Sequence, residues 1–498
     1  SQYGTIWAGN LFVMSTQAAD GGDVLPGGGR LVIADAKTLK RIGSLDVLSY
    51  DGKSGDGRAI AGATPDKVYA GTSNGIYIVD IKDPAAPVVV GRIGLSDNND
   101  LYSGQIGDMI TAGRHVFAVM QANGLIIIDV DTDETSVISD SNVQGVTQTA
   151  DGKVWYCTTG KDDAGANCSV FVALDPETLE EVDRVKMPAS IGTVACGWGA
   201  WRSTAFKGAV DGNDIWFVTG AAGIMGGATG DYYRYTVGED PEGIEPFFSL
   251  TGVMGETGFG EEVGQMTYGT PCFDARNNHL VVMAGRKNAA SGGYRDHWIH
   301  FVDGDSHEIT ETFKLNPYYW FQSLPIFPDK YAPEIEADDF VFIVGDEAEK
   351  RELSVTDKDN IDNNIILTVE PSEYSTVAEV FLDGRMLSVT PLSVGKAYFT
   401  LMAQSNGKIA SKTVAVEVKD KPVGIDDVNT VEGSVSCNGK DVVFRDFSGE
   451  NFALYDMAGH FITDIAVDTD VFVARLGYPA GVYVLRSANG VTAKIVLN

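Results

Sequence analysis

The chain has 498 residues, of which 44% are hydrophobic, and its 37 basic and 69 acidic side chains give a net charge of -32. That length suits about two to four domains with buried cores. The sequence contains no run of about 18 apolar residues, so no transmembrane segment is predicted. Because nucleic-acid binding needs clustered Lys and Arg and no basic block stands out, the charge excludes a nucleic-acid partner. The acidity suits a soluble protein, or one that faces cations or sugars.

A repeated pattern of short β-strands dominates the N-terminal part of the chain. Residues 58–95 contain runs rich in β-branched and aromatic residues, separated by turn residues, and the same order returns at 105–138 and 144–187. Looser copies surround DIWFVTG…DYYRYTV and NHLVVMAG…HWIHFVDG. A period of about 40 to 60 residues with four strands per unit is typical of a β-propeller. Six blades are counted in this way, and the stretch 188–263 leaves room for a seventh.

Both ends of this region are expected to close the ring. The stretch WFQSLPIFPD, residues 320–329, is a candidate first strand that lacks the other strands of its blade. The segments LFVMSTQ, RLVIADA and KRIGSLDV near the N-terminus supply them. Because a blade joined from both ends leaves no open sheet edge, the sequence predicts a closed β-propeller over residues 1–331.

Two smaller all-β units are predicted after the propeller. Residues 332–420 contain about seven short alternating strands, among them KTVAVEVKD, and are expected to form an Ig-like β-sandwich. Residues 421–498 contain NFALYDMAGHFI and LGYPAGVYVLRSANGVTAKIVLN around glycine turns, and are expected to form a second sandwich. Helical periodicity is almost absent, so the predicted fold class is all-β.

Blade topology divides the connections of the predicted propeller between two faces. The loops between the second and third strands of a blade open on the same face as the links between blades, and we call this the long-loop face. Its connections include STQAADGGDVLPGGG, TGAAGIMGGATGD and AGRKNAASGGYRDH, whereas the opposite face has short turns such as TPDK and AGR. Long loops on a rigid scaffold are the usual carriers of a binding site, so a ligand is expected on this face.

Aromatic and arginine side chains gather in and beside the long loops. Aromatic faces flanked by guanidinium groups suit stacking on sugar rings or on a flat macrocycle. The alternative is that many of these rings only pack between blades. The candidate ligand-binding residues in this group are Trp198, Trp201, Arg202, Tyr232, Tyr233, Tyr294, Arg295, Trp298, Tyr319 and Trp320.

A second candidate set consists of long hydrogen-bonding side chains where the six inner strands begin. A ring of amide and guanidinium groups at the mouth of the central channel would grip a polar, uncharged ligand. The alternative is a water-filled channel whose lining is polar for that reason alone. The set is Arg58, Gln105, Gln144, Arg202, Gln265 and Gln322.

Enzyme and metal-binding motifs are weak or missing. The sequence has no GxSxG, HExxH or GxxxxGK[ST], and its glycines at 220–230 join two predicted strands, so no helix dipole awaits a phosphate. His297 and His300 are three residues apart on a strand and point to opposite faces. The stretch DVDTDE begins like a calcium loop at Asp129, but Glu134 stands where the sharp turn requires glycine. We therefore expect a non-enzymatic protein without metal or cofactor; a propeller hydrolase or lyase is the alternative.

The five cysteines give one candidate disulfide. None forms a CxxC pair, which excludes a zinc ribbon or a thioredoxin-like site. Cys157 and Cys168 bracket one predicted loop. In an oxidising compartment they could close it as a disulfide, and two half-buried thiols are the alternative.

Several stretches resemble surface proteins of Bacteroidetes. The blades with GIYIVDI and GLIIIDVDT resemble YncE-like (YVTN-type) propellers. The segment YWFQSLPIFPDKYAPE, at the propeller end, is similar to a domain family of unknown function found in Bacteroidetes surface proteins. The C-terminal LYDMAGHFI and LGYPAGVYVLRSANGVTAKIVLN resemble the sorting domain of Bacteroidetes secretion substrates. Together these resemblances cover most of the chain.

The resemblance implies an exported protein at the outer-membrane surface, with its signal peptide already removed. Some propellers of this broad group resemble the surface proteins that capture cobalamin for a TonB-dependent transporter. A cobamide-like ligand and such a transporter are therefore implied as partners, and a glycan from a polysaccharide-uptake system is the alternative ligand. The resemblance carries over no binding residue. A structural adhesion role is the remaining interpretation.

Overall fold

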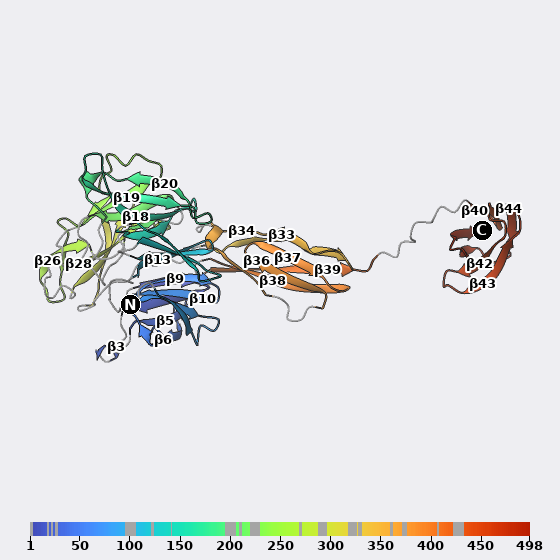
Figure 1. Ribbon diagram of the computed structural model, residues 1–498, viewed down its shortest axis with the longest axis horizontal. Coiled ribbons are helices and arrows are strands. Elements are labelled where there is room, and N and C mark those ends of the chain that lie inside the picture. Colours follow the sequence, from blue (N-terminus) through green and yellow to red (C-terminus); the bar gives the residue numbers. More distant parts are fainter. Residues whose placement is uncertain are drawn as a thin grey trace. The chain divides into compact units, whose positions relative to one another are not determined.

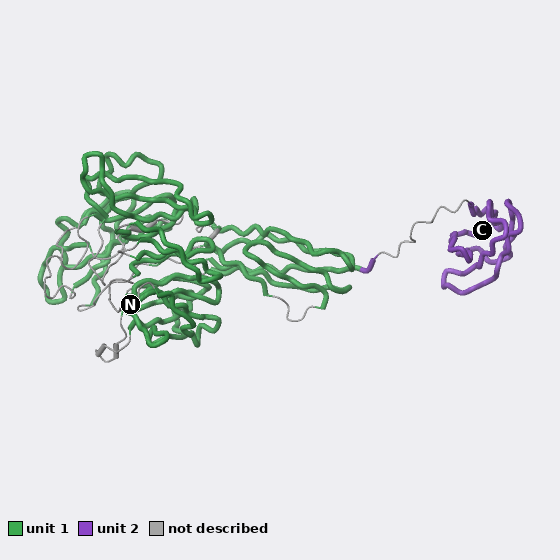
Figure 2. The backbone as a smooth tube through the Cα atoms, in the orientation of Figure 1, with its two compact units in different colours: residues 1–419 green, residues 420–498 purple. Residues whose placement is uncertain are grey.

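The computed structural model consists of β-strands in a propeller and two β-sandwiches (Figure 1). The chain divides into two compact units, residues 1–419 and 420–498 (Figure 2). Among the described residues, no helix is long and apolar enough to cross a membrane. The described residues are 3–16, 19–20, 23–24, 28–94, 106–120, 124–140, 142–194, 206–208, 212–219, 230–267, 271–286, 296–316, 326, 331–358, 362–370, 376–405, 408–421 and 433–498.

Six antiparallel sheets form the propeller blades within the described residues, and in each the strands follow sequence order. The first blade contains β1 (Tyr3–Trp7), β2 (Asn10–Ser15), β5 (Arg30–Asp35) and β6 (Arg41–Leu45). The second contains β9 (Gly57–Thr64), β10 (Lys67–Thr72), β11 (Gly75–Asp80) and β12 (Val88–Ile93). The third contains β13 (Ile106–Ala112), β14 (His115–Met120), β15 (Gly124–Asp129) and β16 (Thr135–Ile138).

The remaining blades follow the same order. The fourth contains β17 (Gly145–Gln148), β18 (Val154–Lys161), β19 (Asn167–Leu174) and β20 (Glu181–Lys186). The fifth contains β21 (Phe206–Gly208), β22 (Asp214–Thr219), β23 (Asp231–Thr236) and β24 (Phe248–Ser249). The sixth contains β25 (Met254–Glu256), β26 (Glu262–Thr267), β27 (Cys272–Asp274), β28 (His279–Arg286), β29 (His297–Asp303) and β30 (Ile309–Lys314).

Short extra elements lie in the connections. They are the hairpins β3 (Ala19–Asp20) with β4 (Asp23–Val24) and β7 (Ser49–Tyr50) with β8 (Lys53–Ser54), and the 3-10 turn η1 (Ala189–Ile191). The stretch 188–263 thus contributes the fifth blade and the beginning of the sixth. Within the described residues it contains no separate seventh blade.

Burial explains why the middle strands of each blade read as continuous apolar runs. The strands GIYIVD and GLIIID are buried on both faces over almost their whole length, because neighbouring blades cover them. The fourth strands lie at the outer edge and alternate, as EVDRVK does in β20. The predicted all-β propeller is therefore confirmed in the structure.

The turn from the third to the fourth strand is built in the same way in four blades. Asp175 Oδ1 accepts hydrogen bonds from the N–H groups of Glu177 at 2.8 Å and Thr178 at 3.0 Å, and Leu179 then takes a positive φ of 61°. These hydrogen bonds, first that from Thr178, lower the pKa of Asp175 because they favour its charged form. Equivalent turns begin at Asp35, Asp129 and Asp303. The motif DVDTDE is therefore such a turn.

Both ends of the propeller region meet at the first blade, although one predicted strand is wrong. In the described sheet β1 pairs with β2 along its length and so takes the place predicted for the stretch 320–329. Within that stretch the structure describes only Ile326. Its Cδ1 lies 2.8 Å from the position that a Cβ on Gly4 would occupy, so the C-terminal end of the region packs against β1.

The segment after the propeller is a two-sheet sandwich. One sheet has the order β32 (Phe340–Ile343), β39 (Lys408–Lys419), β38 (Gly395–Ser405) and β35 (Ile366–Glu370). The other is β33 (Glu349–Glu352), β37 (Met386–Pro391) and β36 (Ala378–Asp383). The pair β31 (Glu334–Glu336) and β34 (Ser354–Thr356) and the turn η3 (Asp362–Asn364) complete it. Its core contains Phe340, Leu401 and Val416.

This sandwich contacts propeller turns on the face opposite the long loops. Arg114, in the turn between β13 and β14, forms an ion pair with Asp383 at 3.4 Å. Ile409 Cδ1 lies 3.5 Å from the position that a Cβ on Gly9 would take, in the turn between β1 and β2. Both turns join the first and second strands of a blade and therefore belong to the face opposite the long loops. These contacts of the sandwich do not cover the long-loop face.

The second unit is a separate small sandwich. Its sheets are β40 (Ser434–Asn438), β41 (Asp441–Arg445) and β44 (Val471–Arg475), against β43 (Phe461–Val467), β42 (Glu450–Asp456), β45 (Gly481–Ser487) and β46 (Thr492–Leu497). Phe444, Phe452 and Leu485 are fully buried between them. Two small sandwiches therefore follow the propeller, as predicted.

Candidate ligand-binding face

Connection length separates most connections of the two faces of the propeller; the exceptions on the opposite face are the links 237–247, between β23 and β24, and 268–278, which contains β27. The longest links on the long-loop face join described strands across residues 94–105, 187–205, 220–230 and 287–296. On the opposite face, two-residue turns join β1 to β2, β9 to β10 and β13 to β14. Apart from the links 237–247 and 268–278, the long connections therefore begin and end on the long-loop face.

Many of the predicted ligand-binding residues lie outside the residues that the structure describes. For these residues the assignment stays a prediction. They are Gln105, Trp198, Trp201, Arg202, Tyr294, Arg295, Tyr319, Trp320 and Gln322.

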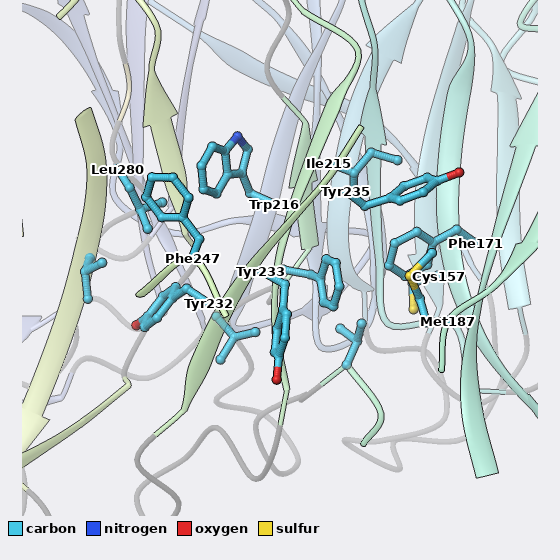
Figure 3. Close-up of a cluster of buried hydrophobic side chains, with 14 of the residues drawn as sticks. Cys157, Phe171, Met187, Ile215, Trp216, Tyr232, Tyr233, Tyr235, Phe247 and Leu280 are labelled. Carbon is cyan, nitrogen blue, oxygen red and sulfur yellow. The ribbon is translucent and has the colours of Figure 1, made fainter. Parts of the chain in front are cut away.

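Three predicted stacking residues belong to the core between blades. Tyr232 and Tyr233 lie on β23 with 1% and 4% of their surface exposed, and Trp298 lies on β29 with 3% exposed. Figure 3 shows Tyr232 beside Phe247 and Tyr233 within the same buried cluster. The Tyr232 hydroxyl bonds to Thr267 Oγ1 at 2.5 Å, and burial raises its pKa. The prediction that these rings stack on a ligand is wrong, because neighbouring blades already cover them.

The inner strands of the first three blades bring together a polar group that we call the channel centre: Tyr3, Arg58 and Asp108. Arg58 is 1% exposed and donates to Gly57 O at 2.9 Å and to Asp56 Oδ2 at 3.2 Å. Burial raises the pKa of Tyr3, while the charges of Arg58 and Asp108 act on it in opposite directions. Arg58 is a predicted channel residue, whereas its neighbours Tyr3 and Asp108 come from other strands and were not predicted.

Gln144 and Gln265, the other described members of the predicted ring, differ in their surroundings. Gln144 precedes β17, is half-buried, and donates its N–H to Cys157 O at 2.8 Å. Gln265 is 1% exposed; its Oε1 bonds to His300 Nε2 at 2.5 Å and its Nε2 donates to Met254 O at 3.1 Å. The prediction that Gln265 faces the channel mouth is wrong, because its amide is engaged inside the sixth blade.

His300 gives this buried network a pH dependence. Burial lowers its pKa to about 4, below its usual 6.5. Between pH 6.5 and pH 4 the folded state therefore binds fewer protons than the unfolded state. The contribution of His300 to the free energy of unfolding is fully present above pH 6.5 and is lost as the pH falls toward 4. We expect a loss of about 2 kcal/mol from this group between pH 7 and pH 4.5.

The measurement is the free energy of unfolding against pH for the wild type and His300→Gln. The variant is expected to lose less stability on acidification than the wild type. Equal slopes in the two proteins would contradict a buried neutral histidine at this position.

The predicted disulfide between Cys157 and Cys168 is absent. In the pairing of β18 with β19, Cys157 lies opposite Phe171 and Cys168 opposite Gly160. The two side chains enter different hydrophobic clusters, on opposite faces of the fourth blade. Cys168 is a buried thiol, and burial raises its pKa. The alternative of separate thiols therefore holds, and Figure 3 shows Cys157 beside Phe171 and Met187.

The sixth blade carries a charged group on the long-loop face that the sequence analysis did not identify. We call Glu261, Arg286 and Asp296 the Arg286 cluster. Arg286 Nη1 lies 3.2 Å from Glu261 Oε2 and 3.9 Å from Asp296 Oδ2. Arg286 ends β28 and Asp296 immediately precedes β29, so the cluster lies at the base of the connection 287–295. The sequence signal that could have predicted this cluster is an arginine and an aspartate at the two ends of one long loop.

Metal binding finds no support in the part of the chain that the structure describes. No group of three or more His, Cys, Asp or Glu side chains there could hold a metal ion. His300 bonds to Gln265 and Thr312, as a neutral imidazole does.

The described residues thus form a β-propeller with six blades, followed by two β-sandwiches, with two polar groups on the inner strands and the long-loop face. Residues 1–328 match the family model of a domain of unknown function, DUF5074, and the chain belongs to this family. The match covers the whole propeller, whereas the sequence resemblance to a domain of unknown function lies only at its end. No curated protein matches the sequence.

Several solved structures are similar. A quinonprotein alcohol dehydrogenase-like protein from Bacteroides thetaiotaomicron is 14% identical with a TM-score of 0.43, over 63% of this chain and 66% of its own. PorZ, a surface component of the type-IX secretion system of Porphyromonas gingivalis, is 12% identical with a TM-score of 0.38, over 99% and 58%. The extracellular domain of a hybrid two-component system from B. thetaiotaomicron is 11% identical with a TM-score of 0.31, over 83% and 54%. The chain therefore spans less than two thirds of these proteins.

Proposed function

We propose that this protein is an exported, YncE-like surface propeller that captures a small polar or macrocyclic ligand on its long-loop face and does not transform it. The ligand is cobamide-like or a glycan. The division of connections carries this proposal: most of the long links open on one face of a rigid ring, whereas the other face carries mainly short turns and the contacts with the first sandwich.

The channel centre supports binding of a ligand through hydrogen bonds. Asp108 Oδ1 accepts the N–H of Met109 at 3.0 Å and its Oδ2 accepts that of Val146 at 3.3 Å. Arg58 is held by Gly57 and Asp56. Fixed charges of opposite sign suit the recognition of a polar ligand without net charge.

The proposed partner is a TonB-dependent transporter in the outer membrane, to which the propeller delivers its ligand. In this proposal the two sandwiches serve as spacers. The first of them supports the assignment because it contacts turns away from the long-loop face.

The test is a thermal-shift screen of the full chain with cobamides and with neutral plant and host glycans, followed by calorimetry on any hit. We expect one of these classes to raise the midpoint; ligand at about 100 times its Kd adds about 2.7 kcal/mol of stability. Mass spectrometry of the recovered ligand is expected to find it unchanged. No shift with any probe would contradict the binding function, and a modified ligand would favour the hydrolase or lyase alternative.

A further inference from the structure

An exposed phenylalanine stands beside the Arg286 cluster. Phe259 lies in the turn between β25 and β26, between two glycines, and is 59% exposed. Its neighbours bind the cluster directly: the N–H of Gly258 donates to Asp296 Oδ1 at 2.8 Å, and Glu261 pairs with Arg286. Thr257 fixes the turn, because its Oγ1 accepts the N–H of Phe259 at 3.3 Å and that of Glu261 at 3.0 Å. The ring is thus presented on a braced turn.

The cluster has hydrogen-bonding capacity left over. Asp296 is 1% exposed, and its Oδ2 has no hydrogen-bond partner among the residues described. Arg286 Nη1 is also buried without a hydrogen bond within this part of the chain. A buried carboxylate oxygen without a partner is costly, so a group that donates to it is stabilised. The cluster reaches the surface through Arg286 and Glu261, whose side chains are 23% and 62% exposed.

The charges restrict what such a group can be. One guanidinium lies between two carboxylates, and the whole chain carries a net charge of -32, so an anionic group is repelled. A cation would be repelled by the positive charge of Arg286. A neutral group that donates to Asp296 and accepts from Arg286 satisfies both atoms, and hydroxyls and primary carboxamides have this chemistry. An aromatic face next to such donors and acceptors suits a ring that bears these substituents.

We propose that Phe259 and the Arg286 cluster form a subsite for an uncharged ring-bearing ligand with hydroxyl or carboxamide substituents. This inference rests on the proposed function, since it places part of the ligand on the long-loop face of the sixth blade. Phe259 supplies the stacking surface, and Arg286 and Asp296 supply one donor and one acceptor. Sugars and cobamides share this chemistry.

The test is calorimetry on the full chain with neutral oligosaccharides in one arm and cobamides in the other. Phe259→Ala and Arg286→Gln are each expected to weaken binding of the ligand about tenfold. The matched controls are Phe313→Ala, an exposed phenylalanine on the outer strand β30, and Arg184→Gln on β20, and both are expected to stay within about twofold of the wild type. Circular dichroism and the melting temperature check that each variant is folded.

The outcomes separate the two proposals. If a probe binds the wild type and both site variants equally well, the subsite is wrong while the proposed function stands. If no probe binds the wild type, the proposed function fails and the subsite fails with it. If Arg286→Gln lowers stability but leaves the Kd unchanged, the cluster is an internal ion pair and the subsite is again wrong. Which arm responds identifies the ligand class.

Discussion

Replacing Trp216 by alanine is expected to lower the free energy of unfolding of the propeller by about 3 to 5 kcal/mol. The side chain is 1% exposed and stacks on Phe273 at a centroid distance of 4.7 Å. Phe247 lies edge-on to it at 4.9 Å, and Figure 3 shows Trp216 beside Phe247. The fifth and sixth blades meet through these rings. Truncation would leave a cavity that the rigid strands cannot close, and it would remove the aromatic contacts as well.

Denaturant unfolding followed by far-UV circular dichroism measures this loss. Trp216→Phe is expected to lose less, because it keeps an aromatic ring in the site. Val137→Ala, on the exposed outer strand β16, is expected to stay within about 0.5 kcal/mol of the wild type. A change in Trp216→Ala no larger than that of this control would contradict the packing between these blades.

Replacing Gly62 by alanine is expected to destabilise the propeller by about 3 kcal/mol through crowding. The indole of Trp7, on β1, lies directly over Gly62 of β9, and a Cβ at this position would overlap the ring. Trp7 Nε1 also donates to Thr64 O at 2.7 Å. Because β1 and β9 belong to the first and second blades, the new methyl group would force the ring out of the contact that joins them.

Melting temperature and the tryptophan emission maximum measure this effect, and the displaced indole is expected to shift the emission to the red. Gly212→Ala is the control, since a Cβ there meets nothing within 4 Å. If Gly62→Ala has the same melting temperature as Gly212→Ala and its tryptophan emission maximum is unchanged, the close approach of Trp7 to Gly62 is wrong.

The repeat allowed most of the propeller to be predicted from sequence. Apolar runs such as GIYIVD and GLIIID, separated by turn residues, identify middle strands because both of their faces are buried. The closing strand was missed since YGTIW is short and half-buried throughout, so its pattern carries little signal. Its assignment depends on its pairing with β2, which is a long-range property of the fold.

The candidate site was harder to predict because exposure of a side chain depends on neighbouring blades. The strand DYYRYT lies third in its blade and is covered on both sides, so its tyrosines pack inward although they follow a long loop. The position of Gln265 at the start of an inner strand predicts a channel residue. Its hydrogen bond to His300, which lies 35 positions away, cannot be read from this local pattern. The approach of Asp296 to Arg286 likewise depends on the register of β28 with β29.

Ligand capture by the long-loop face is best tested by hydrogen exchange of the full chain with and without the ligand found in the screen. With ligand bound, we expect slower exchange in peptides that begin the inner strands and flank the long loops, such as 56–60, 106–110 and 256–265. We expect no change in the tight turns 35–41 and 175–181 on the opposite face. Protection confined to those turns, or to residues 433–498, would contradict ligand capture by the long-loop face.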